Sequence, residues 1–119
     1  QDAGIIVTAS GALTAVGTPS SSIVFKGEQD VTGYWRGLRI ESASAQNVLT
    51  NVTVSNGGSK GFDGANRLAN IELASGSRLT ISQSAISKSG GVGIRDLGGT
   101  LTQSGVVFSG NVAGDAVTP

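Results

Sequence analysis

Short strand-like segments return along this chain at nearly constant spacing. Ile5, Leu38 and Ile71 follow one another in steps of 33 residues, and Leu101 lies 22 residues after Leu79. Each segment is β-branched and bounded by Gly, Ser or Asn, which is the pattern of β-strands separated by turns. A period in the twenties to thirties, with insertions, predicts a solenoid, because one such unit cannot bury its apolar face without neighbours.

The segments fall into sets of three, and each set predicts one turn of a coil. No stretch carries the sustained period of an amphipathic helix. The sets cover residues 5–7, 12–15 and 23–25; 38–40, 48–50 and 52–54; 71–73, 79–81 and 84–86; and 92–94, 101–103 and 106–108. A partial fifth set begins near Val112. We therefore predict an all-β fold of about four stacked turns, with parallel pairing between successive turns.

Alternation within each strand sorts the side chains between core and solvent. The expected stacks of the core are Leu38 under Ile71, Ile40 under Leu73, and Val54 under Ile86 and Phe108. The full predicted core is Leu38, Ile40, Val52, Val54, Ile71, Leu73, Leu79, Ile81, Ile86, Leu101, Val106 and Phe108. The residues predicted to be exposed are Arg39, Thr53, Glu72 and Thr80. Arg39 and Glu72 should then form a surface ion pair, which contributes little to stability.

Two insertions carry most of the aromatic residues. Residues 26–36 and 56–68 both connect the third strand of one turn to the first strand of the next, so we expect them to emerge side by side. Aromatic rings beside charged and polar groups can stack on sugar rings, so these loops are the predicted ligand site. Its residues are Tyr34, Trp35, Arg36, Lys60, Phe62, Asp63 and Arg67. The alternative, favoured for Trp35, is that its side chain folds over the coil and anchors its own loop.

The pattern resembles a known superfamily. The runs 12–18 (ALTAVGT), 33–38 (GYWRGL), 51–58 (NVTVSNGG) and 84–94 (SAISKSGGVGI) look like the repeats of right-handed parallel β-helix proteins of the bacterial cell-surface and secreted type. The resemblance covers nearly the whole chain and implies one right-handed parallel β-helix domain over residues 1–119. It does not select a function, because the superfamily includes lyases, hydrolases, adhesins and scaffolds.

Composition argues against several kinds of chemistry. The chain has 8 basic and 8 acidic residues, no Cys and no His. A neutral balance gives no electrostatic footprint for nucleic acid, and no apolar run is long enough to span a membrane. In the predicted register, no two adjacent turns carry carboxylates in one column, which does not favour a glycosidase pair. We expect no catalytic residue, no metal and no cofactor.

Three local motifs resemble functional patterns only weakly. Residues 90–96 resemble a calcium-binding nonapeptide, but Arg95 stands where an acid is needed, so a Gly-rich corner is the better interpretation. Thr80 and Thr102 share a predicted column, which is too little for an ice-binding face. Residues 51–53 match a glycosylation sequon, but the match lies in a strand.

The predicted function is a non-catalytic extracellular or cell-surface scaffold or adhesin module that contacts carbohydrate through its insertion loops. The alternatives are a fragment of a polysaccharide lyase or hydrolase, and a structural subunit that stacks end to end into a fibre. The first strand begins at Ile5, with no capping element before it, and the chain has no Met. We therefore expect the domain to belong to a longer chain or assembly that makes end-to-end contact with it.

Overall fold

The computed structural model describes residues 3–62 and 67–118, and this part of the chain contains strands and no helix. Runs of two to five residues rich in apolar and β-branched side chains form the strands, and Gly, Ser and Asn separate them. In order they are β1 (Ile5–Val7), β2 (Thr14–Val16), β3 (Ile23–Phe25), β4 (Leu38–Ile40), β5 (Val48–Thr50), β6 (Val52–Ser55), β7 (Ala69–Leu73), β8 (Arg78–Ser82), β9 (Ala85–Ser87), β10 (Val92–Asp96), β11 (Thr100–Ser104), β12 (Val107–Ser109) and β13 (Ala116–Val117).

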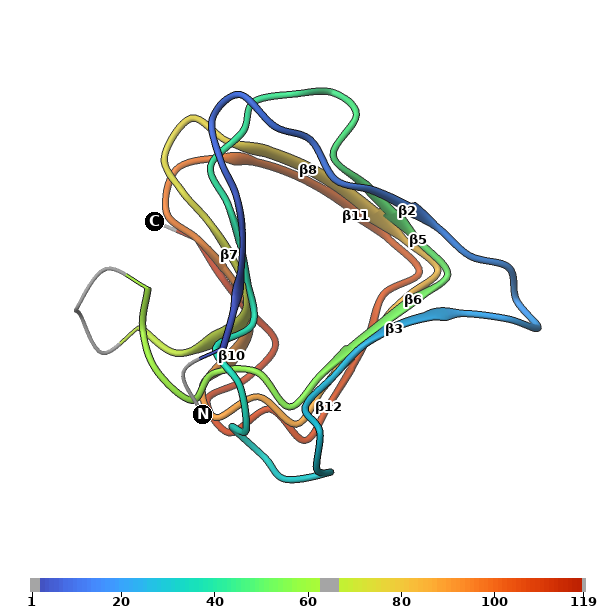
Figure 1. The fold of residues 1–119 in the computed structure, drawn as a ribbon, viewed down its shortest axis with the longest axis vertical. Coiled ribbons are helices and arrows are strands. Elements are labelled where there is room, and N and C mark those ends of the chain that lie inside the picture. Colours follow the sequence, from blue (N-terminus) through green and yellow to red (C-terminus); the bar gives the residue numbers. More distant parts are fainter. Residues whose placement is uncertain (1–2, 63–66, 119) are drawn as a thin grey trace.

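The strands form three parallel sheets that enclose one core. The first sheet has the order β1-β4-β7-β10-β13, the second β11-β8-β5-β2, and the third β12-β9-β6-β3. Seen end-on, successive turns overlie one another around a triangular outline (Figure 1). The chain is thus a parallel β-helix of about four turns with three strands in each turn, as the spacing of the segments predicts.

The pairing register confirms the predicted stacks. Leu38 pairs with Ile71, and Ile40 with Leu73. Val54 pairs with Ile86, which in turn pairs with Phe108 of the last turn. Because side chains alternate along a strand, this register places the apolar columns inside the coil.

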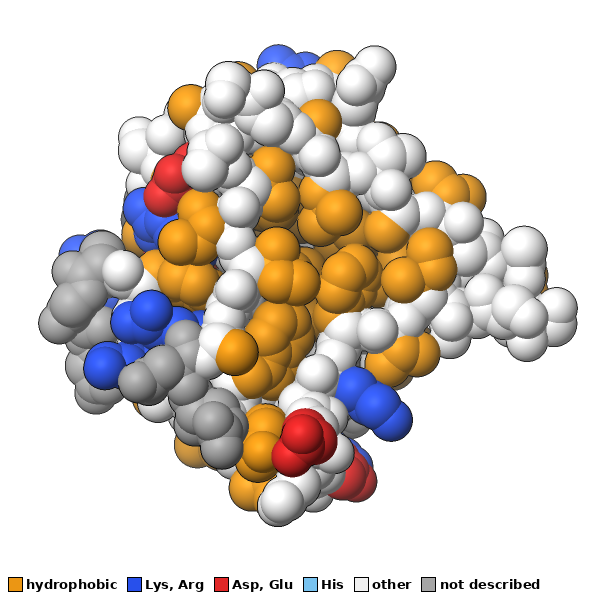
Figure 2. All heavy atoms as spheres, in the orientation of Figure 1, with side chains coloured by type: hydrophobic (Ala, Val, Ile, Leu, Met, Phe, Trp, Pro, Cys, Tyr) orange, Lys and Arg blue, Asp and Glu red, His pale blue; other side chains and the backbone are white. Residues whose placement is uncertain are grey.

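The predicted sorting of side chains between core and solvent is nearly right, with two corrections, of which the first concerns the core. Nine of the predicted core residues are buried, from Leu38 to Ile86 along the chain, whereas Leu101, Val106 and Phe108 are only partly buried. The reason is that β11 and β12 lie at the edges of their sheets. In the end-on space-filling view, hydrophobic side chains gather in the middle of the triangle (Figure 2).

The second correction concerns the outer face of the first sheet. Glu72 was predicted to be exposed, but it is 1% exposed. It points outward, and on that face it lies in register between Arg39 of β4 and Arg95 of β10. Arg39, Thr53 and Thr80 are half-buried rather than fully exposed. Strand alternation correctly predicts the direction of these side chains but not what lies beside and over them.

The corners of the coil repeat one backbone conformation. Between the second and third sheets, Asn51, Gln83 and Gly105 have φ values of 52°, 50° and 62°. The corner after the third sheet repeats this with Asn56, Lys88 and Gly110, at 68°, 56° and 65°. Positive φ costs an ordinary side chain about 1 kcal/mol or more, whereas glycine adopts it freely, so successive turns bend at the same place although only some of them carry strain there.

Candidate functional site

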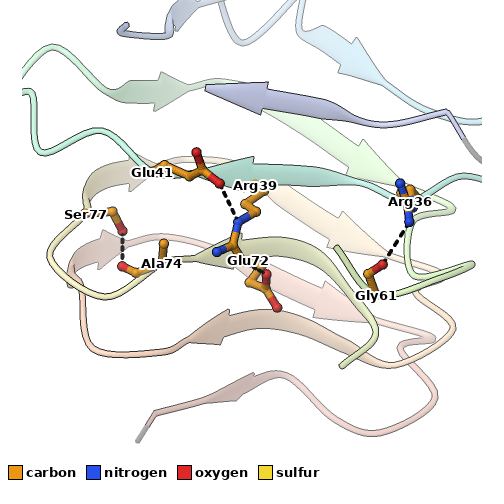
Figure 3. Close-up of polar contacts among 7 residues, drawn as sticks. All are labelled: Arg36, Arg39, Glu41, Gly61, Glu72, Ala74 and Ser77. Atoms are coloured by element: carbon orange, nitrogen blue, oxygen red, sulfur yellow. Dashed lines mark hydrogen bonds and ion pairs between the residues drawn. The ribbon is translucent and has the colours of Figure 1, made fainter. Parts of the chain in front are cut away.

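The two insertion loops meet at one corner of the coil, which we call the loop corner (residues 26–36 and 56–62). The Ser59 amide donates to the Trp35 carbonyl at 2.9 Å. The Arg36 Nη2 donates to the Gly61 carbonyl at 3.1 Å (Figure 3). These bonds confirm that the two loops emerge side by side.

The side chains of Arg36 and Phe62 stack against one another. The Arg36 guanidinium carbon lies 5.6 Å from the centre of the Phe62 ring, a distance suited to cation–π attraction. The backbone of Gly4 lies against the same ring, since a Cβ there would come within 3.0 Å of it. The buried Nε of Arg36 has no hydrogen-bond partner. This pair therefore joins the loops and leaves little of the Phe62 ring available for a sugar.

Trp35 folds over the coil and anchors its own loop, which is the alternative that the sequence favours for this residue. It is 7% exposed and belongs to the hydrophobic core. Its indole Nε1 donates to the buried Ser55 carbonyl at 2.7 Å. The Trp35 amide also donates to the Asn56 carbonyl at 3.0 Å. The ring thus pins residues 26–36 against the end of β6.

A hollow of about 360 Å³ opens beside this anchor. Its lining residues are Ala3, Gly27, Glu28, Tyr34 and Trp35. The Tyr34 ring lies directly against Gly27, where a Cβ would come within 2.6 Å of it. Glu28 is exposed. The hollow therefore combines a partly exposed aromatic side chain with one carboxylate, which accepts hydrogen bonds.

The buried amide side chain of Asn56 holds the loop that carries Tyr34. Asn56 is 1% exposed, and its Oδ1 accepts from the Gly27 amide at 3.3 Å. Its Nδ2 donates to Asp30 at 3.2 Å. Asp30 also pairs with Lys88 at 2.7 Å. Hydrogen bonding from Lys88, and then from Asn56, lowers the pKa of the Asp30 carboxyl.

A second charged cluster lies on the outer face of the first sheet. Arg39 donates through Nε to Glu41 at 2.8 Å and through Nη1 to Glu72 (Figure 3). Burial opposes the charge on Arg39, but the hydrogen bonds to Glu41 and Glu72 and the attraction of their charges together outweigh it and raise its pKa. The buried Oε1 of Glu72 has no partner. One guanidinium thus bonds to both carboxylates, and Glu72 is 1% exposed and out of reach of a substrate, so the pair does not supply a general acid and base.

The structure places the predicted ligand residues in three groups. Tyr34 and Trp35 line the hollow, and Arg36 and Phe62 stack on one another. Lys60 and Arg67 are exposed, and Asp63 lies outside the described residues. The sequence prediction missed Glu28, although it lies in the same insertion as Tyr34; that shared loop was the available signal.

Within residues 3–62 and 67–118, no group of three or more His, Cys, Asp or Glu side chains gathers as metal ligands would. Over the same residues, no helix is long and apolar enough to cross a membrane.

The chain matches no family model, and it has no significant match among curated proteins or solved structures. The parallel β-helix assignment therefore rests on strand order and register alone. The resemblance to bacterial surface and secreted β-helix proteins stays a prediction.

Proposed function

We propose that this chain is a non-catalytic β-helix module of a secreted or cell-surface protein, and that its loop corner binds carbohydrate. The observation that carries the proposal is the hollow beside Trp35. It is of a size that small ligands occupy, and it offers the Tyr34 ring next to the Glu28 carboxylate. An aromatic side chain supplies an apolar contact for the C–H face of a sugar, and a carboxylate accepts bonds from its hydroxyl groups.

The supporting geometry is rigid rather than adaptive. The Trp35 indole donates a hydrogen bond to the Ser55 carbonyl, and the Asn56 side chain accepts one from the Gly27 amide. A site held by buried groups loses less entropy when a ligand binds. Because Glu28 is negatively charged, we expect neutral or amino sugars to bind better than uronic acids.

The first test is an NMR titration of the isotope-labelled chain with neutral monosaccharides, amino sugars and galacturonate. We expect saturable shifts of the amides of residues 27–35. Replacing one hydrogen-bonding group changes affinity by about three- to tenfold, so Glu28→Gln should weaken binding by that factor. Tyr34→Ala should weaken it further by removing the apolar contact.

The matched control is Glu41→Gln, because Glu41 is a carboxylate paired with Arg39 and is not among the residues that line the hollow. This variant should bind like the original chain. Absence of shifts at residues 27–35 with every sugar in the panel would contradict the proposal. So would equal loss of binding in the Glu28 and Glu41 variants. Secretion and the end-to-end contact expected from the sequence stay predictions.

A further inference from the structure

A groove lies away from the loop corner, where the second sheet meets the third. Its volume is about 320 Å³, and residues from all four turns line it. The first turn contributes Thr18 and Ser22, and the following turns contribute Thr53, Gln83 and Val107. Since neighbouring strands lie about 4.8 Å apart, the lining extends about 14 Å along the axis of the coil.

One wall of the groove is the connection between β2 and β3, which reaches outward from the coil (Figure 1). Thr18 and Ser21 pair across this turn. The Gly17 amide donates to the Thr50 carbonyl at 2.8 Å, and the Asn51 Nδ2 donates to the Gly17 carbonyl at 3.3 Å. A Cβ on Gly17 would come within 2.6 Å of the Asn51 carbonyl oxygen. The wall is therefore fastened to the second turn at a position that only glycine fits.

The floor of the groove is the outer face of the third sheet. Thr53 pairs with Ala85, and Ala85 pairs with Val107. Between these strands the backbone groups are used in the parallel ladder, so the middle of the floor offers side chains and no free sheet edge. A peptide that adds a strand needs such an edge, and in the third sheet the edges are β12 and β3 at its two ends.

Polar side chains in the groove have spare hydrogen-bonding capacity. The Thr53 hydroxyl, the Ser22 hydroxyl and the Gln83 amide make no hydrogen bond with the described part of the chain. Gln83 also keeps a strained φ of 50°, although the equivalent corner of the next turn is Gly105. This φ belongs to the corner that successive turns repeat, and the Gln83 amide lies over Gly105, where a Cβ would come within 2.6 Å of it.

We propose that this groove binds a neutral oligosaccharide chain that lies along the axis of the coil. None of the lining residues is charged, so the groove gives no attraction for phosphate or uronate groups. Hydroxyl and amide groups both donate and accept hydrogen bonds, as sugar hydroxyls do. Val107 and Ala85 supply apolar contact for the C–H groups of the sugar rings. This site is separate from the loop corner and does not depend on it.

The test uses the same labelled chain, titrated with cellotetraose, xylotetraose and mannotetraose, and with tetragalacturonate as the charged comparison. We expect at least one neutral tetrasaccharide to give saturable shifts at Thr53, Gln83 and Ala85. Thr53→Val removes one hydroxyl without changing the shape of the side chain and should weaken binding about three- to tenfold. Gln83→Gly, which copies Gly105 of the next turn, should weaken it by a similar factor while keeping the corner folded.

Thr102→Val is the matched control, because Thr102 is an exposed threonine on the second sheet, outside the groove. It should bind as the original chain does. Three results would overturn the proposal: no saturable shifts in the groove with any neutral tetrasaccharide, equal binding of tetragalacturonate, or equal weakening by Thr102→Val. Shifts confined to residues 27–35 would support the loop corner and reject the groove, and shifts confined to the groove would do the reverse.

Discussion

The guanidinium of Arg39 binds the carboxylate of Glu72 from the next turn, and that carboxylate is 1% exposed. A buried charge that loses its partner is strongly destabilising, whereas an apolar pair of similar volume can be neutral. The pair therefore makes two neighbouring turns depend on one another.

Arg39→Met should lower the free energy of unfolding by about 3 kcal/mol, because it leaves Glu72 buried without its partner. The double variant Arg39→Met/Glu72→Met should recover most of that loss. Urea unfolding followed by circular dichroism measures both. If the single variant costs less than about 0.5 kcal/mol, as an exposed pair would, the assigned burial of Glu72 is wrong.

Ile40→Ala should lower the free energy of unfolding by about 2–5 kcal/mol, because Ile40 is fully buried against Leu73 and its truncation leaves a cavity. The comparison is Thr102→Ala on the exposed face, which should change stability by no more than about 0.5 kcal/mol. Equal losses in the two variants would contradict the register.

Trp35 is the only tryptophan, so fluorescence reports on this one site. Because its ring is buried, acrylamide should quench the folded chain weakly and the urea-unfolded chain strongly. Trp35→Phe removes the bond to Ser55 and should cost about 1–2 kcal/mol of stability. Equal quenching in both states would show that the ring does not anchor the loop.

Gly91→Ala should destabilise the coil by about 1–3 kcal/mol through overpacking, since a Cβ there would come within 2.0 Å of the Leu68 carbonyl oxygen. Gly11→Ala is the matched control, because its nearest atom would be 3.5 Å away. That change should be neutral or stabilise the chain by up to about 1 kcal/mol. Similar thermal midpoints for the two variants would refute the close approach at Gly91.

The Asp30 carboxyl should titrate below its ordinary pKa, because Lys88 and Asn56 hydrogen-bond to its charged form. A lowered pKa in the folded state contributes stability that is present above the pKa of the unfolded chain. That contribution is lost as the pH falls through the folded value. In Lys88→Ala the pKa should move upward towards the ordinary value, as carboxyl NMR titration will measure. An unchanged titration would exclude the pair with Lys88.

The sequence alone was sufficient for the repeat, the three strands per turn and the apolar columns. These follow from local alternation and constant spacing, so the stack of Ile40 on Leu73 could be predicted without coordinates. The meeting of the two insertions was also predictable, because both leave the coil at the same corner. The repeat, the apolar columns and the position of the insertions all depend on the order of residues along the chain, so they can be recognised in the sequence.

Only the tertiary structure decided what surrounds each outward side chain. Alternation shows that Glu72 points away from the core, but its burial depends on Arg39 and on the neighbouring turn that bears Arg95. The same limit applies to the hollow beside Glu28 and to the groove at Gln83, whose lining residues come from segments far apart in sequence. A strand pattern specifies the direction of a side chain, whereas burial and binding geometry depend on which distant segments pack against it.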